Sequence, residues 1–475
     1  MQVVPRFNEQ INKTRKEMIS RRAFNQGLVA LAFTGLSQHV LAKNAGLSNQ
    51  LLSKTLGYGK LNNDPQGILD LPSGFSYRVI SALGETMSDS LVVPDQADGM
   101  GCFALDEDRV VLVRNHEIST TISAPKNLAH SNKINLDLAY DINRHQQALP
   151  GGTSHLIYNL KTERLERQFM SLIGTIRNCS GGITPWNSWL TCEESVQKVS
   201  EENSKDHGYI FEVPANVTSL TKATPLLAMG RFNHEAACVD PKTNIVYLTE
   251  DRADSLFYRF IPKTPKKLAD GGRLQALVIV KKEKFDTRNW HSETMKIGDN
   301  YATKWIDLSD VQSPNDDLRQ QGFEAGAALF ARGEGIHWAE NELYFCCSSG
   351  GSEKIGQIMR YVPSKFEGEK NEEEYPGSLS LFVESADKLT FNYGDNICVA
   401  PNQHLMVCED QYTDTVDNHI KGITPDGRIY DFAKVRWQTE PAGGCFSPDG
   451  NVFFVNLYSP ALTLAVTGPW QKFLS

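Results

Sequence analysis

The clearest structural pattern in the chain is the stretch NHEAACVDPKTNIVYLTED, from Asn233 to Asp251. Two apolar runs, Ala236 to Val239 and Ile245 to Leu248, flank the residues DPKTN. This linker is a turn by composition, because Pro fixes φ and because Asp and Asn side chains bond their own backbone. The pattern predicts a β-hairpin whose open end brings His234 together with three carboxylates. Carboxylates so close to one another need a cation, a shared proton or water.

Five other stretches repeat this order of apolar run, turn and second apolar run, and most end on polar residues. They are GMGCFALDEDRVVLVRNHE from Gly99, NCSGGITPWNSWLTCEE from Asn178, GEGIHWAENELYFCCSS from Gly333, GDNICVAPNQHLMVCED from Gly394 and PAGGCFSPDGNVFFVNLY from Pro441. One hairpin cannot bury its own apolar face, whereas a ring of hairpins can. The repeats therefore predict an all-β fold, a six-bladed β-propeller with loop and helix insertions. The open ends of the hairpins would surround one end of the central channel.

Composition places the chain among soluble globular proteins. It has 475 residues, of which 40% are hydrophobic and 22% charged, and its net charge of −9 argues against non-specific nucleic-acid binding. Beyond the N-terminus no stretch approaches the roughly 20 apolar residues of a membrane span, so we expect no stable membrane insertion. We expect a single propeller domain over residues 43–475. An insertion at about residues 263–325 includes a possible helix that begins near Phe323 and extends to Ala331.

The N-terminus, residues 1–42, is typical of a twin-arginine signal peptide. The residues SRRAF, with the arginine pair at Arg21 and Arg22, precede an apolar run from Gly27 to Leu36, and a cleavage site is expected after Ala42. An amphipathic N-terminal helix with a chance arginine pair is the alternative. The signal predicts that the twin-arginine export machinery moves the folded protein to the periplasm or out of the cell.

The nine cysteines do not suggest a disulfide framework, because their number is odd and the chain is large. Most lie inside apolar runs, where cysteine behaves as a small hydrophobe. Cys179 differs because it lies at the open end of the second hairpin, beside carboxylates. A thiolate there would be a soft metal ligand among hard oxygen ligands. The alternative is a buried and inert thiol.

The open ends of the hairpins collect mostly oxygen donors, which are the ligands of calcium and similar hard cations. Carboxylates together with one thiolate also suit a transition metal. Polar residues are common at solvated strand ends, but their recurrence favours one shared metal site. The predicted metal ligands are Glu117, Cys179, Glu193, Glu194, Glu235, Glu250, Asp251, Glu334, Asp395, Asn396, Glu409 and Asp410.

An arginine accompanies these acidic residues. Arg332 lies two residues before Glu334, and residues at this spacing point to the same side of a strand. The planar guanidinium fork suits phosphate oxygens. We therefore expect Arg332 and Glu334 to be catalytic residues, and Arg332 and Asn178 to bind the substrate.

The motifs RNHE, NCSGGITPWNSWLTCEE, GRFNHEAACVDPKTNIVYLTEDR, RGEG, GDN and GGCFSPDGNVFFVN make the chain similar to the PhoX-type alkaline phosphatases, over roughly residues 60 to 460. The resemblance implies a six-bladed propeller, twin-arginine export, hydrolysis of phosphate monoesters and a mixed cluster of iron and calcium. By position, it implies that Cys179 is an iron ligand, that Glu235 and Glu334 bind metal, and that Arg332 grips the phosphate. This chain departs from the pattern at Cys346 to Ser349, where the fourth hairpin does not end on an acidic residue.

We therefore predict a metal-dependent hydrolase that transfers the phosphoryl group of small phosphate esters to water. One alternative is a calcium-dependent lactonase or esterase on a similar propeller, which would need calcium but not Cys179. Another is a secreted propeller without enzymatic activity, which would use calcium structurally and bind a ligand or a protein on its face. Iron content and phosphate release distinguish the three.

Overall fold

The described part of the chain has an all-β, propeller-like fold with few helices. The computed structural model describes residues 56–120, 134–411 and 413–474, which belong to one compact unit, Gln50–Ser475. The predicted signal peptide lies outside the described residues. In the ranges described, no helix has both the length and the apolar character that a membrane crossing requires.

The third hairpin has the predicted form. Strands β11 (His234–Val239) and β12 (Val246–Glu250) pair antiparallel, and Val239 is the register partner of Val246. In the turn, the Asp240 carboxylate accepts hydrogen bonds from Lys242 N and Thr243 Oγ1, both at 2.7 Å. The turn residues therefore act as their composition predicts.

Among the described residues, all pairs of named strands are antiparallel, and these strands form five sheets. The first hairpin lies in a four-stranded sheet of β4 (Ala97–Ala104), β5 (Arg109–His116), β6 (Gly151–Asn159) and β7 (Arg164–Thr175). The second hairpin lies in a three-stranded sheet of β8 (Asn178–Ile183), β9 (Ser188–Glu193) and β10 (Ile210–Pro214). The fifth hairpin lies in a six-stranded sheet of β1 (Leu61–Asn62), β2 (Leu69–Pro72), β20 (Gly394–Val399), β21 (Leu405–Glu409), β22 (His419–Ile423) and β23 (Ile429–Val435). The sixth hairpin lies in a four-stranded sheet of β24 (Pro441–Phe446), β25 (Val452–Leu457), β26 (Leu462–Thr467) and β3 (Ser76–Ala82).

The remaining sheet has nine strands and contains both middle hairpins. Besides β11 and β12 it comprises β13 (Tyr258–Pro262), β14 (Gly272–Ile279), β15 (Asn300–Asp307), β16 (Gly333–Trp338), β17 (Leu343–Cys347), β18 (Gln357–Val362) and β19 (Ser378–Glu384). Pairing of β15 with β19 joins its two halves, and its edge strands β11 and β16 contact each other, so this sheet nearly closes on itself. The all-β propeller-like prediction is confirmed, but five sheets do not divide plainly into six blades.

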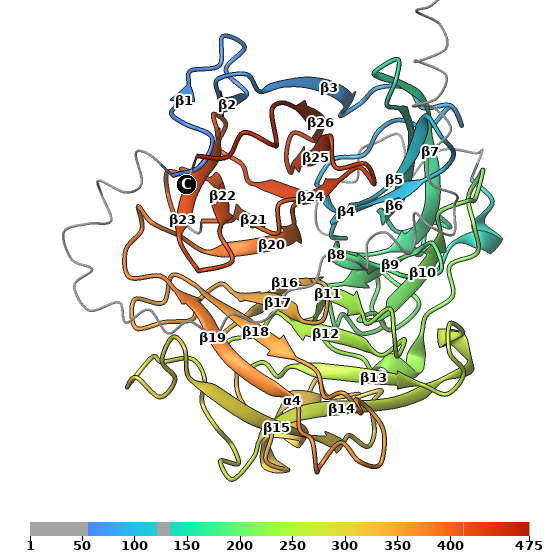
Figure 1. Cartoon of the computed structure of the whole chain (residues 1–475). Helices are drawn as coiled ribbons and strands as arrows, with labels where there is room; N and C mark the ends of the chain where they lie inside the picture. The colour runs from blue at the N-terminus through green and yellow to red at the C-terminus, as the bar shows by residue number, and fades with distance from the viewer. Residues whose placement is uncertain (1–55, 121–133, 412, 475) are drawn as a thin grey trace, which may run out of the picture. The chain divides into compact units, whose positions relative to one another are not determined.

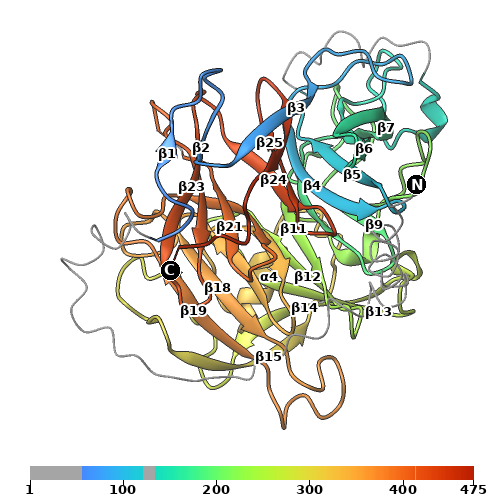
Figure 2. The same ribbon diagram turned by 45° about the horizontal axis from the view of Figure 1, so that its top comes forward.

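The first strands of the six hairpins are neighbours in a closed order, β4, β8, β11, β16, β20, β24 and again β4 (Figure 1). We call these six the inner strands. Their backbones approach so closely that only glycine fits at some positions. A Cβ at Gly182 of β8 would lie 1.9 Å from Ala237 O of β11, and a Cβ at Gly443 of β24 would lie 2.3 Å from Asp98 O of β4. The early strand β3 completes the sheet of the last hairpin by pairing with β26 (Figure 1). Figure 2 shows β3 near β24 and β25 of the same sheet.

The predicted insertion contributes to the sheet as well as to loops. Its residues form β14 and β15, and its only described α-helix is α4 (Leu318–Glu324), which begins before the predicted residues 323–331. Short 3-10 turns occur at η1 (Leu136–Leu138), η2 (Leu227–Met229) and η3 (Leu268–Asp270). Apolar side chains fill the spaces between strands, as where the rings of Phe257 and Phe345 stack with centroids 4.4 Å apart.

Candidate metal centre

Every inner strand is irregular at its open end. The register shifts after Ala97, Asn178, His234, Gly333, Gly394 and Ala442. Such a bulge adds a residue that the partner strand does not match, and bulges often re-aim a side chain beside a functional site. In five of the six inner strands, the residue that directly follows the start of the shift has a carboxylic acid or a thiol side chain. These residues are Asp98, Cys179, Glu235, Glu334 and Asp395.

The second strands of the hairpins supply a second set of polar groups. In five hairpins, the residue that follows the second strand reaches the same region: Glu117, Glu194, Asp251, Ser348 and Asp410. Successive residues of a strand point to opposite sides, so the residue before each of these points away from it. Where two acidic residues are consecutive at the end of a second strand, their side chains therefore point in opposite directions. One points toward the channel, and the other points toward the interior of its own sheet.

Nine ionisable side chains form a continuous group, which we call the channel cluster. Its members are Asp98, Glu117, Cys179, Glu194, Glu235, Glu334, Asp395, Asp410 and Glu440. They form four sets of three, and within each set one potential ligand atom per residue lies within 4.8 Å of the others. Cys179, Glu235 and Asp395 each belong to two sets, so they link the sets into one row.

Burial makes negative charge costly in this cluster. Burial first, and then the charges of neighbouring carboxylates, raise the pKa values of Asp98 and Glu235 well above the usual range and raise the pKa of Asp395 to about 8. The same two causes raise the pKa of the Cys179 thiol. A cation bound among these groups would favour their ionised forms and remove this cost.

The donor atoms suit a metal. Cys179 Sγ lies 3.2 Å from Glu235 Oε1 and 3.6 Å from Asp98 Oδ2, so a thiol and two carboxylates converge. Asp98 Oδ1 is buried and has no hydrogen-bond partner, which is rare for a native polar atom. A cation bound at this position would give Asp98 Oδ1 the partner that it lacks. The residues therefore fit a metal, with soft and hard donors side by side.

Two arginines lie at the edge of the channel cluster. Arg332 Nε and Nη2 contact the two Asp251 carboxylate oxygens at 2.6 and 2.7 Å, and Nη2 lies 3.2 Å from Glu334 Oε1. Ser348 Oγ donates to the same Glu334 oxygen at 2.5 Å. Arg177 contacts Glu117 through Nε at 2.8 Å and through Nη2 at 2.7 Å, and also pairs with Glu194. The predicted residues Arg332, Asp251 and Glu334 are therefore neighbours.

Besides Arg332, six predicted metal ligands or substrate-binding residues are not members of the channel cluster. One is Asp251, which pairs with Arg332 at the edge of the cluster instead of joining a set. Glu193, Glu250 and Glu409 are last residues of their strands and turn the other way, so strand alternation separates each from its cluster neighbour. Glu250 accepts a hydrogen bond from Tyr258 at 2.6 Å, and Glu409 accepts from the backbone of Asn392 at 2.9 Å. The two predicted amides are occupied by protein partners. Asn178 bonds Thr175 and Thr191, and Asn396 bonds Gly443 N and Asp395.

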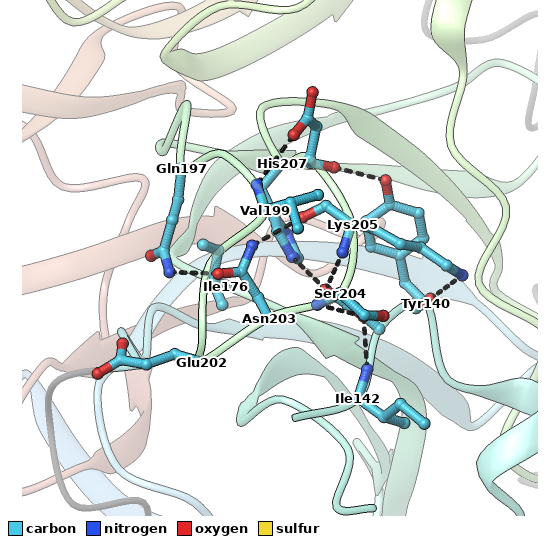
Figure 3. Close-up of polar contacts among 12 residues, drawn as sticks. Tyr140, Ile142, Ile176, Gln197, Val199, Glu202, Asn203, Ser204, Lys205 and His207 are labelled. Carbon is cyan, nitrogen blue, oxygen red and sulfur yellow. Dashed lines mark hydrogen bonds and ion pairs between the residues drawn. The ribbon is translucent and has the colours of Figure 1, made fainter. Parts of the chain in front are cut away.

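Glu193 belongs instead to a buried carboxylate–imidazole–carboxylate network. His207 Nδ1 lies 2.6 Å from Glu193 Oε1, and His207 Nε2 lies 3.2 Å from Asp141 Oδ2. The backbone N–H groups of Gly208 and Ser204 donate to these two carboxylates. Figure 3 shows polar contacts of the loop that contains His207, with Asn203, Ser204 and Lys205 among the labelled residues. Glu193 thus fixes the loop after β9 to the segment around Asp141, and Glu194 next to it faces the cluster.

The comparisons with known proteins agree with this architecture. The chain matches the family model described as alkaline phosphatase PhoX over residues 56–461. The chain belongs to this PhoX family. Among solved structures it is similar to Pseudomonas fluorescens PhoX in complex with vanadate, a transition state analogue, with 16% identity, a TM-score of 0.64, and coverage of 87% of this chain and 98% of that one. At this identity the likeness shows a shared fold.

Other structural likenesses of this PhoX-family chain are weaker. A gluconolactonase from Xanthomonas campestris shares 13% identity and a TM-score of 0.34, with coverage of 79% of this chain and 97% of that one. The Cps50 (Swd1) β-propeller domain of Myceliophteria thermophila shares 9% identity and a TM-score of 0.40, with coverage of 82% and 99%. These scores are too low to support an argument about fold or activity. No curated protein sequence matches the chain.

Sequence reasoning missed three residues of this PhoX-family site. Asp98 is the second residue of its inner strand, as Cys179, Glu235 and Glu334 are, so strict alignment of the hairpins would have found it. Arg177 precedes its inner strand as Arg332 does, and the same alignment would have found it. Glu440 precedes β24, and no sequence signal marks it, because the sixth hairpin has no acid at the positions that the other hairpins use.

Because the side chains of Glu193 and Glu194 point in opposite directions, we expect their replacement to affect different properties of the protein. Glu194→Gln is expected to lower the metal content, because it removes a carboxylate of the channel cluster. Glu193→Gln is expected to leave the metal content unchanged and to lower the free energy of unfolding by about 1–3 kcal/mol, because it weakens a buried hydrogen-bonded charge network. Elemental analysis and urea unfolding of both variants check this. Equal metal loss in the two variants would show that the pair is not divided.

His207 predicts a pH dependence of stability. Burial lowers its pKa, but the charges and hydrogen bonds of Glu193 and Asp141 outweigh burial and raise the pKa to about 9. The unfolded pKa is about 6.5, so the stabilisation is full below that pH and is lost as the pH rises through about 9. The stability difference between wild type and His207→Gln should therefore shrink by about 3 kcal/mol between pH 6 and pH 10.

His404→Gln is the matched control for this experiment. His404 is also a buried histidine, and it bonds the Tyr430 hydroxyl at 3.0 Å. Burial lowers its pKa to about 4, so its charge does not change between pH 6 and pH 10. Urea unfolding should show a pH-independent effect for His404→Gln in this range. A similarly pH-independent effect for His207→Gln would contradict the assigned network.

Proposed function

We propose that this PhoX-family chain hydrolyses phosphate monoesters at the channel cluster. The observation that carries the proposal is the match to the alkaline phosphatase family across residues 56–461, a range that includes every residue of the cluster. The donor chemistry of the cluster and the arginine at its edge agree with it. The substrates are small phosphate esters, and the acceptor of the phosphoryl group is water.

We propose that the cluster holds iron and calcium. Two sets contain Cys179, one with Asp98 and Glu117 and the other with Glu194 and Glu235. Both offer a thiolate together with carboxylates, which suits iron. The two sets without a thiol contain oxygen donors only and suit calcium: Glu235, Glu334 and Asp395, then Asp395, Asp410 and Glu440. When bound, such cations neutralise the negative charge of the phosphate oxygens.

Side chains around the cluster position the phosphate. The planar fork of Arg332 binds phosphoryl oxygens and stabilises the charge that develops on them during transfer. Asp251 and Glu334 fix the orientation of this guanidinium, and Ser348 fixes Glu334 in turn. Tyr458 Oη donates to Glu117 Oε2 at 2.7 Å and so orients a carboxylate of the set that contains Asp98 and Cys179. These groups are in place before the substrate binds, which lowers the reorganisation that the reaction needs.

We further propose that each inner strand marks one blade, which gives six. The support is the same register shift at the open end of all six inner strands, together with their closed neighbour order. The third and fourth blades are then joined through β15 and β19 into the nine-stranded sheet. A solved structure in which β11–β14 and β16–β19 do not form two radial units around the channel would refute this count.

Residues 1–42 are proposed to direct twin-arginine export, so that one propeller domain over residues 43–475 acts in the periplasm or outside the cell. The support is the arginine pair at Arg21 and Arg22 before an apolar run. Cell fractionation tests this proposal. A chain with Lys at both positions should remain in the cytoplasm, and its undiminished export would refute the assignment.

The activity is tested with the full-length exported protein, purified without chelators. It should release p-nitrophenol from p-nitrophenyl phosphate, lose that activity in EDTA, and show no comparable turnover of δ-gluconolactone or p-nitrophenyl acetate. Lactone or acetate turnover without phosphate release would indicate the lactonase or esterase alternative. Bound calcium with no turnover of any of these substrates would indicate a binding module.

A further inference from the structure

Arg177 and Arg332 hold equivalent places in two different hairpins. Each is the residue immediately before its inner strand, β8 or β16, and each has a positive φ, 46° and 54° respectively. Non-glycine residues with positive φ are uncommon, and such strained residues cluster at functional sites. The backbone N–H of Arg177 donates to Ile118 O at 3.1 Å, and that of Arg332 donates to Arg252 O at 2.9 Å. Both acceptors directly follow the acid that the arginine side chain binds.

The side chains of the two arginines repeat this equivalence. Arg177 binds Glu117 through Nε and Nη2, and Arg332 binds Asp251 through the same two nitrogens. Each Nη2 also meets one further acid, Glu194 in the first case and Glu334 in the second. The side-chain amide of Asn233 donates to Glu194 Oε1 at 3.0 Å and to Asp251 O at 3.2 Å, and so links the two units. The two guanidinium groups therefore lie in one row at the edge of the cluster, separated by a single pair of carboxyl groups.

Arg177 differs in exposure from the acids that it binds. Its side chain is 40% exposed, although the carboxylates that it binds are 9% and 8% exposed. By contrast, Arg259, which pairs with the buried Glu367, has a side chain that is only 2% exposed. Arg177 keeps a surface that a ligand can reach.

We propose that Arg177 binds the substrate phosphate as a second guanidinium, beside Arg332. This inference rests on the proposed phosphatase function. A phosphate monoester carries two negative charges near neutral pH, and two planar forks can together contact several of its oxygens. A phosphodiester carries one negative charge and has one oxygen fewer to offer. Arg177 therefore makes the site selective for monoesters over diesters.

Arg177→Lys is the variant that separates substrate binding from charge balance. Lysine keeps the positive charge beside Glu117 and Glu194 but lacks the planar fork. The exported Arg177→Lys protein should retain the wild-type content of iron and calcium. Its KM for p-nitrophenyl phosphate and its inhibition constants for inorganic phosphate and vanadate should each rise about tenfold or more, because a charge-assisted contact is lost. Hydrolysis of bis(p-nitrophenyl) phosphate should change less than threefold.

Arg360→Lys is the matched control. Arg360 on β18 is also 40% exposed and pairs with a glutamate, Glu342, but it lies outside the cluster. Its replacement should change none of these constants. Thermal unfolding with and without inorganic phosphate gives a second readout, and phosphate should stabilise Arg177→Lys less than wild type.

The outcomes separate the inference from the proposed function. Unchanged KM and unchanged phosphate inhibition in a metal-replete Arg177→Lys protein would overturn the role of Arg177. Loss of iron or calcium in Arg177→Lys would overturn it as well, because Arg177 would then act as a counter-ion of metal ligands. A wild-type protein that releases no phosphate from monoesters would overturn the proposed function instead.

Discussion

Glu235→Gln is expected to abolish metal binding at the centre of the channel cluster and to lower kcat/KM for phosphate monoesters by roughly 10²–10³-fold. Glu235 is the carboxylate shared by a set with the Cys179 thiol and a set with oxygen donors only. Its side chain is buried, and its Oε1 lies 3.2 Å from Cys179 Sγ. The amide is nearly the same size, so the effect comes from the lost charge and not from packing. The fall corresponds to about 3–4 kcal/mol of transition-state stabilisation.

Glu250→Gln is the matched control for Glu235→Gln. Glu250 is buried at the same open end of this hairpin, on the partner strand, and looks like a ligand in the sequence, but its carboxylate accepts a hydrogen bond from Tyr258 instead. Elemental analysis and steady-state kinetics should show wild-type metal content and activity in Glu250→Gln. Loss of metal in Glu250→Gln with retention in Glu235→Gln would reverse the assignment of the two faces of this hairpin.

Arg332→Ala is expected to have the second largest effect on activity. Its guanidinium is 22% exposed, held by Asp251 and Glu334, so it presents fixed donors to a phosphate at the edge of the cluster. Losing a charged hydrogen-bonding partner of the transition state should cost about 2–3 kcal/mol, or roughly 30–150-fold in kcat/KM. A fall in kcat/KM with unchanged metal content is the expected result. Little change in kcat/KM would remove Arg332 from the mechanism.

Arg319→Ala serves as the control for Arg332→Ala. Arg319 on α4 is similarly shielded, with 13% exposure, and pairs with Glu250, Asp254 and Asp316, which do not belong to the cluster. Its replacement should leave kcat/KM within about threefold of wild type, since its contacts are local ion pairs. A fall as large as that of Arg332→Ala would mean that the activity responds to general loss of positive charge around the site.

The local parts of the fold were predictable because the signals are local. The turn at Asp240 and the apolar runs on either side of it determine the third hairpin, and the repeats determine an all-β ring. The sheet that joins β15 to β19 was not predictable. It depends on pairing between strands separated by a long stretch of chain, which no turn signal in the sequence fixes.

The site was predictable in composition but less so in detail. Cys179, Glu194, Glu235 and Glu334 are in the cluster as expected, because strand ends at one side of a ring converge. Glu193 and Glu409 are predicted as ligands because they lie at the ends of their hairpins, but this position alone does not show which way a side chain points. Counting alternate residues along each strand assigns the last strand residue to the interior and the next to the channel. Glu440 could be found only from the three-dimensional structure.

Elemental analysis of the full-length protein, exported and purified without chelators, is the most direct test of the central claim that the channel cluster is a metal centre. Wild type and the Glu235→Gln variant should be measured together with p-nitrophenyl phosphate turnover. The account predicts iron and calcium in wild type, with the loss of both metal and turnover in Glu235→Gln. Full turnover by a wild-type protein that contains neither metal would contradict it.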